Sequence, residues 1–148
     1  MEEEDFLRKI FVLFIGIALL SGCNLESSLT YSELSKQSIH QDIQSFFDRV
    51  KQENGVHLYY DNQNEAVYVY LNGFNVTQGE EAIHFTGFDV ERDHDILNIL
   101  YKSEETAERN NSSLAYELFY KVDVDQDYEY IKLFHNGIES TFDTISGS

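Results

Sequence analysis

The sequence predicts an α+β fold in which one N-terminal helix packs on an antiparallel meander sheet of six or seven strands, and the sheet can curl into a partial barrel. Three observations support this class. The chain has 148 residues, the length of one ordinary domain. Its hydrophobic content of 42% is enough to build a core. A single helical apolar stripe is followed by repeated runs of strand character.

The first segment has the pattern of a targeting signal. Arg8 and Lys9 precede an apolar run at residues 10–20, which would form a helix of about 16 Å at ~1.5 Å per residue. That is too short for a hydrocarbon core of roughly 30 Å. A basic flank, a short apolar run and small residues at a cleavage site are typical of a signal peptide.

The residues after this run, Leu20-Ser21-Gly22-Cys23, resemble the lipobox of bacterial lipoproteins. The resemblance implies cleavage between Gly22 and Cys23 and a diacylglyceryl group on the Cys23 thiol. It covers the targeting segment alone. Two acyl chains hold a protein stably on a bilayer, so the resemblance implies an anchor on the extracytoplasmic face of the cell membrane. The abundance of Tyr, Phe, Asn, Ile and Asp indicates an AT-rich genome and favours a Gram-positive source. A buried free cysteine after a core strand is the alternative.

These observations divide the chain into a cleaved signal peptide at residues 1–22, a lipidated cysteine with a polar tether at 23–35, and one domain at 36–148. The acidic residues 2–5 are unusual in the basic flank of a signal peptide. A true start at position 7 is therefore an alternative to Met1.

The helix is predicted from an apolar stripe at steps of three and four residues. Ser35 or Ser38 can cap its start, and Asn54-Gly55 supplies a left-handed stop. We expect the stripe to cover the sheet of its own domain, with docking on a partner or a membrane as the alternative. The stripe consists of Ile39, Ile43, Phe46, Phe47 and Val50.

Strand patterns begin at residue 56. Residues 56–60 and 65–71 flank a polar turn at 61–64 and predict a hairpin. Turns are also expected at Asn72-Gly73 and Asn136-Gly137, because Asn and Gly tolerate positive φ. We expect residues 114–124 to pair with 128–135. The remaining strands are predicted at 82–90, 95–103 and 138–145.

The strand at 65–71 is apolar on both faces, because aliphatic residues alternate with Tyr68 and Tyr70. One helix cannot cover both faces. Either the sheet curls into a partial barrel or sandwich, or a tyrosine-lined face stays exposed. Tyrosine suits binding surfaces, so Tyr59, Tyr68 and Tyr70 are candidate binding residues. Tyrosine also suits a half-buried pleated surface, and packing within the sheet is the principal interpretation.

Four alternating acids form a second candidate, because calcium prefers several hard oxygen ligands. Their opening resembles that of an EF-hand loop, but Tyr128 stands where the loop needs glycine and Phe134 where it needs glutamate. A solvated acidic hairpin tip is the principal interpretation, and a calcium site outside the EF-hand type is the alternative. The four acids are Asp123, Asp125, Asp127 and Glu129.

No catalytic residue is assigned from the sequence. His94 lies between carboxylates at residues 91–95, but no nucleophile adjoins it, and the five histidines have no metal-ligand spacing. The chain has one cysteine, which excludes an internal disulfide and a CxxC site. A net charge of −17 excludes the basic footprint that nucleic-acid binding needs.

We therefore expect a lipid-anchored, non-enzymatic lipoprotein that acts through protein contacts, with a membrane protein as the expected partner. In class and size it is similar to exclusion or immunity lipoproteins of prophages and mobile elements. The alternative is a ligand-binding envelope module for a glycan, a peptide or calcium. An envelope hydrolase is the third interpretation.

Overall fold

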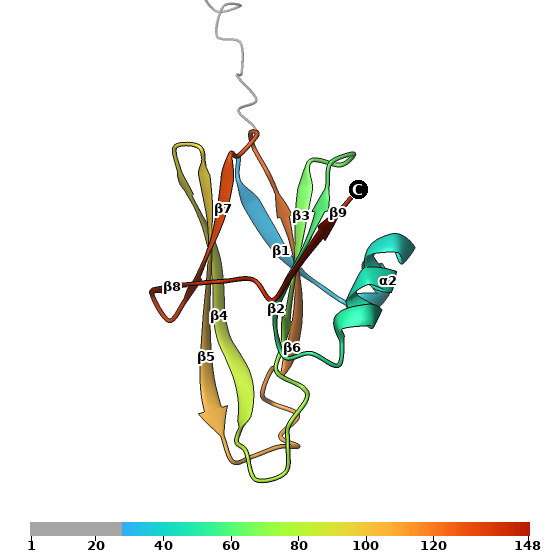
Figure 1. Ribbon diagram of the computed structural model, residues 1–148, viewed down its shortest axis with the longest axis vertical. Helices are drawn as coiled ribbons and strands as arrows, with labels where there is room; N and C mark the ends of the chain where they lie inside the picture. Colours follow the sequence, from blue (N-terminus) through green and yellow to red (C-terminus); the bar gives the residue numbers. More distant parts are fainter. Residues whose placement is uncertain (1–27) are drawn as a thin grey trace, which may run out of the picture.

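A computed structural model describes residues 28–148 (Figure 1). The predicted signal peptide, the cleavage site at Gly22 and the lipid site at Cys23 lie outside the described residues. Within residues 28–148, no helix is long and apolar enough to cross a membrane.

The described residues form two β-sheets and one α-helix (Figure 1). The five-stranded sheet has the order β1-β6-β3-β2-β9, and the four-stranded sheet has the order β4-β5-β7-β8. In chain order the elements are β1 (Thr30–Leu34), the 3-10 helix η1 (Lys36–Ser38), α2 (Gln41–Val50), β2 (Gly55–Asp61), β3 (Ala66–Asn72), β4 (Ala82–Asp93), β5 (Ile96–Thr106), β6 (Glu117–Asp123), β7 (Tyr130–His135), β8 (Ile138–Ser140) and β9 (Thr144–Gly147).

The larger core fills the space between the two sheets. Successive side chains of a strand point to opposite faces, so Val67, Val69 and Leu71 of β3 share the face that meets the four-stranded sheet. Leu97 and Ile99 of β5 pack against them from the other sheet and are fully buried. The aliphatic faces of the two sheets therefore form one apolar layer.

The second core lies between α2 and the opposite face of the five-stranded sheet. Figure 1 shows α2 on the side of this sheet that faces away from the four-stranded sheet. The predicted stripe of α2, with Ile39 just before the helix, is buried there. Phe47 is central, with its ring 5.2 Å from that of Tyr70 and 5.5 Å from that of Phe119. The predicted helix and its stripe are confirmed. The predicted cap is not, because His40 occupies the N-cap position in place of Ser35 or Ser38.

The predicted α+β class, with a helix on a single antiparallel meander, is wrong. The described residues are mainly strand, form two facing sheets and make no closed barrel. Two of the strand pairings, β2 with β9 and β5 with β7, are parallel. The physical reason is that β3 is buried along all seven residues, so its sheet needs a cover on each face.

Two predicted local connections are crossovers between the sheets. The strands β6 and β7, expected to pair around an acidic tip, belong to different sheets. Asn72-Gly73 does not close a hairpin either, because residues 73–81 carry the chain from β3 to β4. Turn chemistry indicates that the chain bends, but it does not specify the sheet that the next strand joins.

The predicted tether contains a strand. Residues 30–34 form β1, which pairs antiparallel with β6 at one edge of the five-stranded sheet. Tyr31 donates a hydrogen bond from its hydroxyl to the backbone oxygen of Phe88, 3.0 Å away on β4. The folded unit thus includes residues that the sequence assigned to the linker.

Other local predictions are confirmed. The strands β2 and β3 form the expected hairpin, with Tyr59 opposite Tyr68. The Asn136-Gly137 turn joins β7 to β8 with φ of 49° and 84°, as a two-residue turn with positive φ at both positions requires. The predicted strand at 138–145 is instead divided into β8 and β9, which lie in different sheets.

We predict that Phe47→Ala lowers the free energy of unfolding by about 3–5 kcal/mol, because it removes a buried ring and leaves a cavity. Phe47 is 1% exposed, whereas Phe74, in the β3–β4 crossover, is 69% exposed. Phe74→Ala is therefore the matched control, with an expected change within about 0.5 kcal/mol. Chemical denaturation measures both. If Phe47→Ala does not fold, Phe47→Leu gives a smaller and measurable loss. Equal losses of unfolding free energy at the two positions would contradict the core between α2 and the five-stranded sheet, called the helix-side core below.

Candidate functional site

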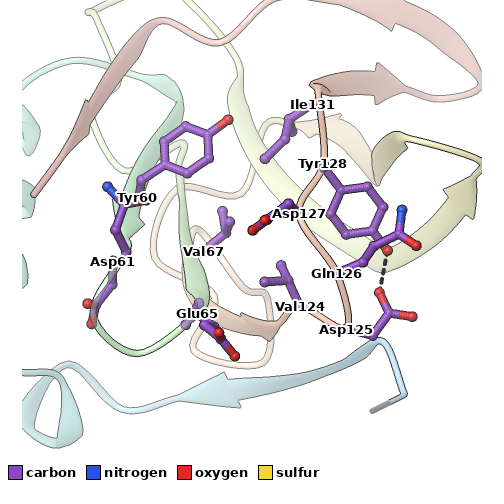
Figure 2. Close-up of a pocket in the computed structure, with 12 residues that line it drawn as sticks. Tyr60, Asp61, Glu65, Val67, Val124, Asp125, Gln126, Asp127, Tyr128 and Ile131 are labelled. Carbon is purple, nitrogen blue, oxygen red and sulfur yellow. Dashed lines mark hydrogen bonds between the residues drawn. The ribbon is translucent and has the colours of Figure 1, made fainter. Parts of the chain in front are cut away.

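A pocket of about 360 Å³ opens at one end of the sandwich. The tip of the β2–β3 hairpin and the β6–β7 crossover form its walls, and β7 contributes Ile131 (Figure 2). Its lining residues are Tyr60, Asp61, Asn62, Glu65, Ala66, Val67, Val124, Asp125, Gln126, Asp127, Tyr128 and Ile131.

The apolar part of the pocket continues the inter-sheet core. Val67 belongs to that core, and Tyr60, Val124, Tyr128 and Ile131 are partly buried against it. The pocket lies where the two sheets end and the crossover closes only part of the gap between them. An apolar surface with nearby polar groups is typical of ligand-binding clefts.

The pocket carries four carboxylates, those of Asp61, Glu65, Asp125 and Asp127, and no Lys or Arg among the lining residues that the structure describes. Asp61 accepts hydrogen bonds from the backbone and side chain of Asn64, so it stabilises the hairpin turn. The other three differ in how their charge is compensated.

Asp125 is held in a network at the pocket wall. Its carboxylate accepts a hydrogen bond of 2.7 Å from Arg92 Nη1 and one of 2.5 Å from the Tyr128 hydroxyl. The Asp125 side chain is 3% exposed, while that of Arg92 is 54% exposed. The guanidinium thus compensates a buried charge from the solvent side, and the network fixes the Tyr128 ring at the pocket wall.

Asp127 and Glu65 are exposed at the pocket, and neither side chain makes a hydrogen bond or ion pair with another described residue. In Figure 2 the carboxylate of Asp127 points into the space between Tyr60 and Tyr128. The half-buried Tyr60 hydroxyl has no hydrogen-bond partner within residues 28–148, and burial raises its pKa. These groups are available to a ligand.

The four predicted metal-binding acids do not meet at one point. Asp123 ends β6 and pairs with Lys121 at 2.5 Å, and Asp125 pairs with Arg92. Asp127 points into the pocket, and Glu129 is exposed and does not line the pocket. No group of three or more His, Cys, Asp or Glu within residues 28–148 is arranged to hold a metal ion.

The tyrosines proposed as a binding face lie beneath α2. Tyr59, Tyr68 and Tyr70 are 8%, 6% and 1% exposed and belong to the helix-side core. The Tyr70 hydroxyl donates to Glu117 at 2.6 Å, and burial, followed by this carboxylate, raises the Tyr70 pKa strongly. A ligand would reach these rings only if the helix moved away. Tyr60 and Tyr128, which the sequence did not distinguish from the other strand tyrosines, are the pair at the pocket.

The acidic and histidine-containing segment at 91–95 is mostly strand. Residues 91–93 continue β4, and His94 occupies the turn to β5 with φ of 57°. Its Nδ1 lies 2.7 Å from an oxygen of Asp93, and its backbone oxygen accepts a hydrogen bond from Gln126. The segment therefore fixes the β4–β5 tip against the crossover.

The structure pairs Ser103 with His135, an arrangement that the sequence did not indicate. Their Oγ and Nε2 atoms are 2.7 Å apart because β5 and β7 are parallel neighbours. A serine with a histidine base is a possible nucleophile pair, but the other His135 nitrogen has no partner within residues 28–148. Neither residue lines the pocket, and Tyr101 stacks on His135 at 4.6 Å. The pair supports packing of the sheet surface.

Comparisons of this chain with protein-family models, curated proteins and solved structures found no match. Function is therefore inferred from the pocket and from the lipobox-like residues that end in Cys23.

We predict that Asp125→Asn lowers the pKa of Tyr128, which is about 12 in the unmodified protein. Desolvation is the largest cause of the raised pKa and the hydrogen bond to Asp125 is the next, so the pKa in the variant should fall but stay above 10. Titration followed by NMR of ζ-carbon-labelled tyrosine measures this shift. Tyr120 is the control. Burial raises its pKa to about 12 as well, but it makes no hydrogen bond to Asp125, so its pKa should not change.

The raised Tyr128 pKa also fixes the sign of a stability change. Between pH 10 and about 12 the unfolded chain loses this proton while the folded chain keeps it. The contribution of Tyr128 to stability is therefore complete below pH 10 and is lost as the pH rises through 12. Denaturation midpoints that rise over this interval would contradict the assignment.

Proposed function

We propose that this protein is a lipid-anchored, non-enzymatic binding protein of the extracytoplasmic membrane face, which contacts a membrane protein through the pocket end of its sandwich. The lipobox-like residues ending in Cys23 support the anchor. The pocket supports binding as the activity, because Asp127 points into it between Tyr60 and Tyr128, and its described lining residues include no serine, cysteine or histidine.

One observation carries this proposal: the described chain begins at the pocket end. Thr30, the first residue of β1, pairs with Asp123, the last residue of β6, and the next residue, Val124, lines the pocket. Figure 1 places the start of β1, the β2–β3 tip and the β6–β7 crossover at the same end. Six residues lie between Cys23 and Thr30, and the seven steps from one to the other span at most about 25 Å. A lipid on Cys23 would therefore keep the pocket near the bilayer.

Charge favours a protein partner over the lipid surface. The chain has a net charge of −17, and anionic headgroups repel an acidic domain. A small acidic lipoprotein held in this way could mask part of a membrane protein, as exclusion or immunity lipoproteins do. The pocket also favours the second candidate, an envelope module that binds a small ligand or peptide.

We predict that Cys23→Ala abolishes membrane retention, because the thiol that carries the diacylglyceryl group is lost. Fractionation of expressing Gram-positive cells and incorporation of a labelled fatty acid measure the effect. Ser27→Ala, outside the lipobox, is the control and should remain in the membrane fraction. A Cys23→Ala protein that still partitions with membranes and accepts the label would contradict the anchor.

We also predict that the pocket end faces the bilayer. A donor dye on Asn62→Cys, at the β2–β3 tip, should transfer more energy to headgroup acceptors in proteoliposomes than the same dye on Asn110→Cys. Residue 110 is in the β5–β6 loop at the other end, and long strands such as β4, with 12 residues, separate the ends by roughly 40 Å at ~3.3 Å per residue. Equal or greater transfer from residue 110 would contradict this orientation.

A further inference from the structure

The pocket has negative charge that no described basic group compensates. Glu65 and Asp127 lack ion-pair partners, and the ion pairs of residues 28–148 place Lys121 on Asp123 and Arg92 on Asp125. An opposite charge stabilises a carboxylate that has no ion-pair partner. The electrostatics of the pocket therefore favour a cationic ligand.

The walls of the pocket also suit a cation with an apolar stem. Tyr60 and Tyr128 lie on either side of the Asp127 carboxylate in Figure 2. Aromatic faces attract ammonium groups through the ring quadrupole. Val67, Val124 and Ile131 line the apolar part of the cavity, where a methylene chain can pack while its charged end stays near the carboxylate.

The protein already uses this chemistry once at the same site. The Arg92 guanidinium donates a hydrogen bond to the Asp125 carboxylate, which also accepts one from the Tyr128 hydroxyl. Asp127, two residues further along the crossover, points into the cavity without such a cation.

We propose that the pocket binds a lysine side chain of a partner protein, with the ammonium group on Asp127 between Tyr60 and Tyr128 and the methylene chain against the valine and isoleucine surface. This deepens the proposed function by naming the partner group, and it rests on the binding role given there to the pocket end. A phosphoethanolamine headgroup fits less well, because its phosphate would lie two carbons from the ammonium and approach Asp61, Glu65 and Asp125. Calcium fits less well too, because the carboxylates do not converge.

The test is a titration of the full chain in detergent micelles with N-α-acetyl-lysine methylamide, followed by NMR of ζ-carbon-labelled tyrosine. The signals of Tyr60 and Tyr128, assigned with Tyr60→Phe and Tyr128→Phe, should shift and saturate. The signal of Tyr59, buried under α2, should not move. The norleucine analogue, which has the apolar stem without the ammonium, should produce no saturable shift.

Asp127→Asn should weaken lysine binding by about tenfold or more, which corresponds to roughly 1.4 kcal/mol. Asp89→Asn is the matched control, because this substitution removes the same charge. Asp89 is exposed on β4 and does not line the pocket. Its affinity for the lysine compound should equal that of the unmodified protein.

The proposal is overturned if the lysine compound causes no shift, if norleucine binds equally, or if Asp127→Asn binds as tightly as Asp89→Asn. Equal or tighter binding of phosphoethanolamine would assign the pocket to a lipid headgroup, and equivalent shifts with calcium chloride would assign it to a metal ion. Because the titration uses micelles, its outcome is independent of membrane retention and orientation, so the lysine site and the anchored function can fail separately.

Discussion

The central constraint on this structure is that the five-stranded sheet is buried on both faces. All seven residues of β3 are buried, and the strand has no exposed face that could interact with water. A strand of this kind is stable only when a separate layer covers each side of the sheet. The helix α2 covers one face and the four-stranded sheet covers the other, which gives three layers from a chain of 148 residues.

The alternation of side chains along β3 sorts residues between these layers. Valine and leucine face the four-stranded sheet, while Tyr68 and Tyr70 face the helix. Aromatic rings fill the layer between the helix and the sheet, where Phe47 packs against Tyr70 and Phe119. The tyrosine hydroxyls reach the edge of this layer, where that of Tyr70 donates to Glu117. The tyrosine enrichment of these strands therefore serves packing beneath α2.

The pocket follows from the way in which the two sheets are joined. A hairpin between β6 and β7 would have kept both strands in one sheet, whereas the crossover carries the chain across the open end of the inter-sheet core. Its acids therefore lie over an apolar opening. Arg92 compensates the charge of Asp125 and the Tyr128 hydroxyl donates a hydrogen bond to it, so both hold the crossover in place, while Asp127 points into the cavity. The β6–β7 crossover thus carries one carboxylate that stabilises the structure, that of Asp125, and one that is available to a ligand, that of Asp127.

The sequence by itself determined the elements whose signal is local. The apolar stripe of α2 has helical spacing, the turn at 61–64 joins two strands directly, and Asn136-Gly137 supplies two positive φ values. It also determined that the 65–71 strand is apolar on both faces, and hence that one helix could not complete the fold. The lipobox-like segment is a purely sequential signal and stays a prediction.

Only the tertiary structure decided which sheet each strand joins. The parallel pairs β2–β9 and β5–β7 bring together segments that are far apart in the sequence, and no local pattern specifies such pairings. For the same reason the sequence identified the acids of the crossover but not the site. Asp127 has Tyr60 as a neighbour because the β2–β3 tip and the crossover meet at one end of the sandwich. Spacing along the chain sets the face on which a side chain lies, whereas the layers packed over that face determine what the side chain contacts.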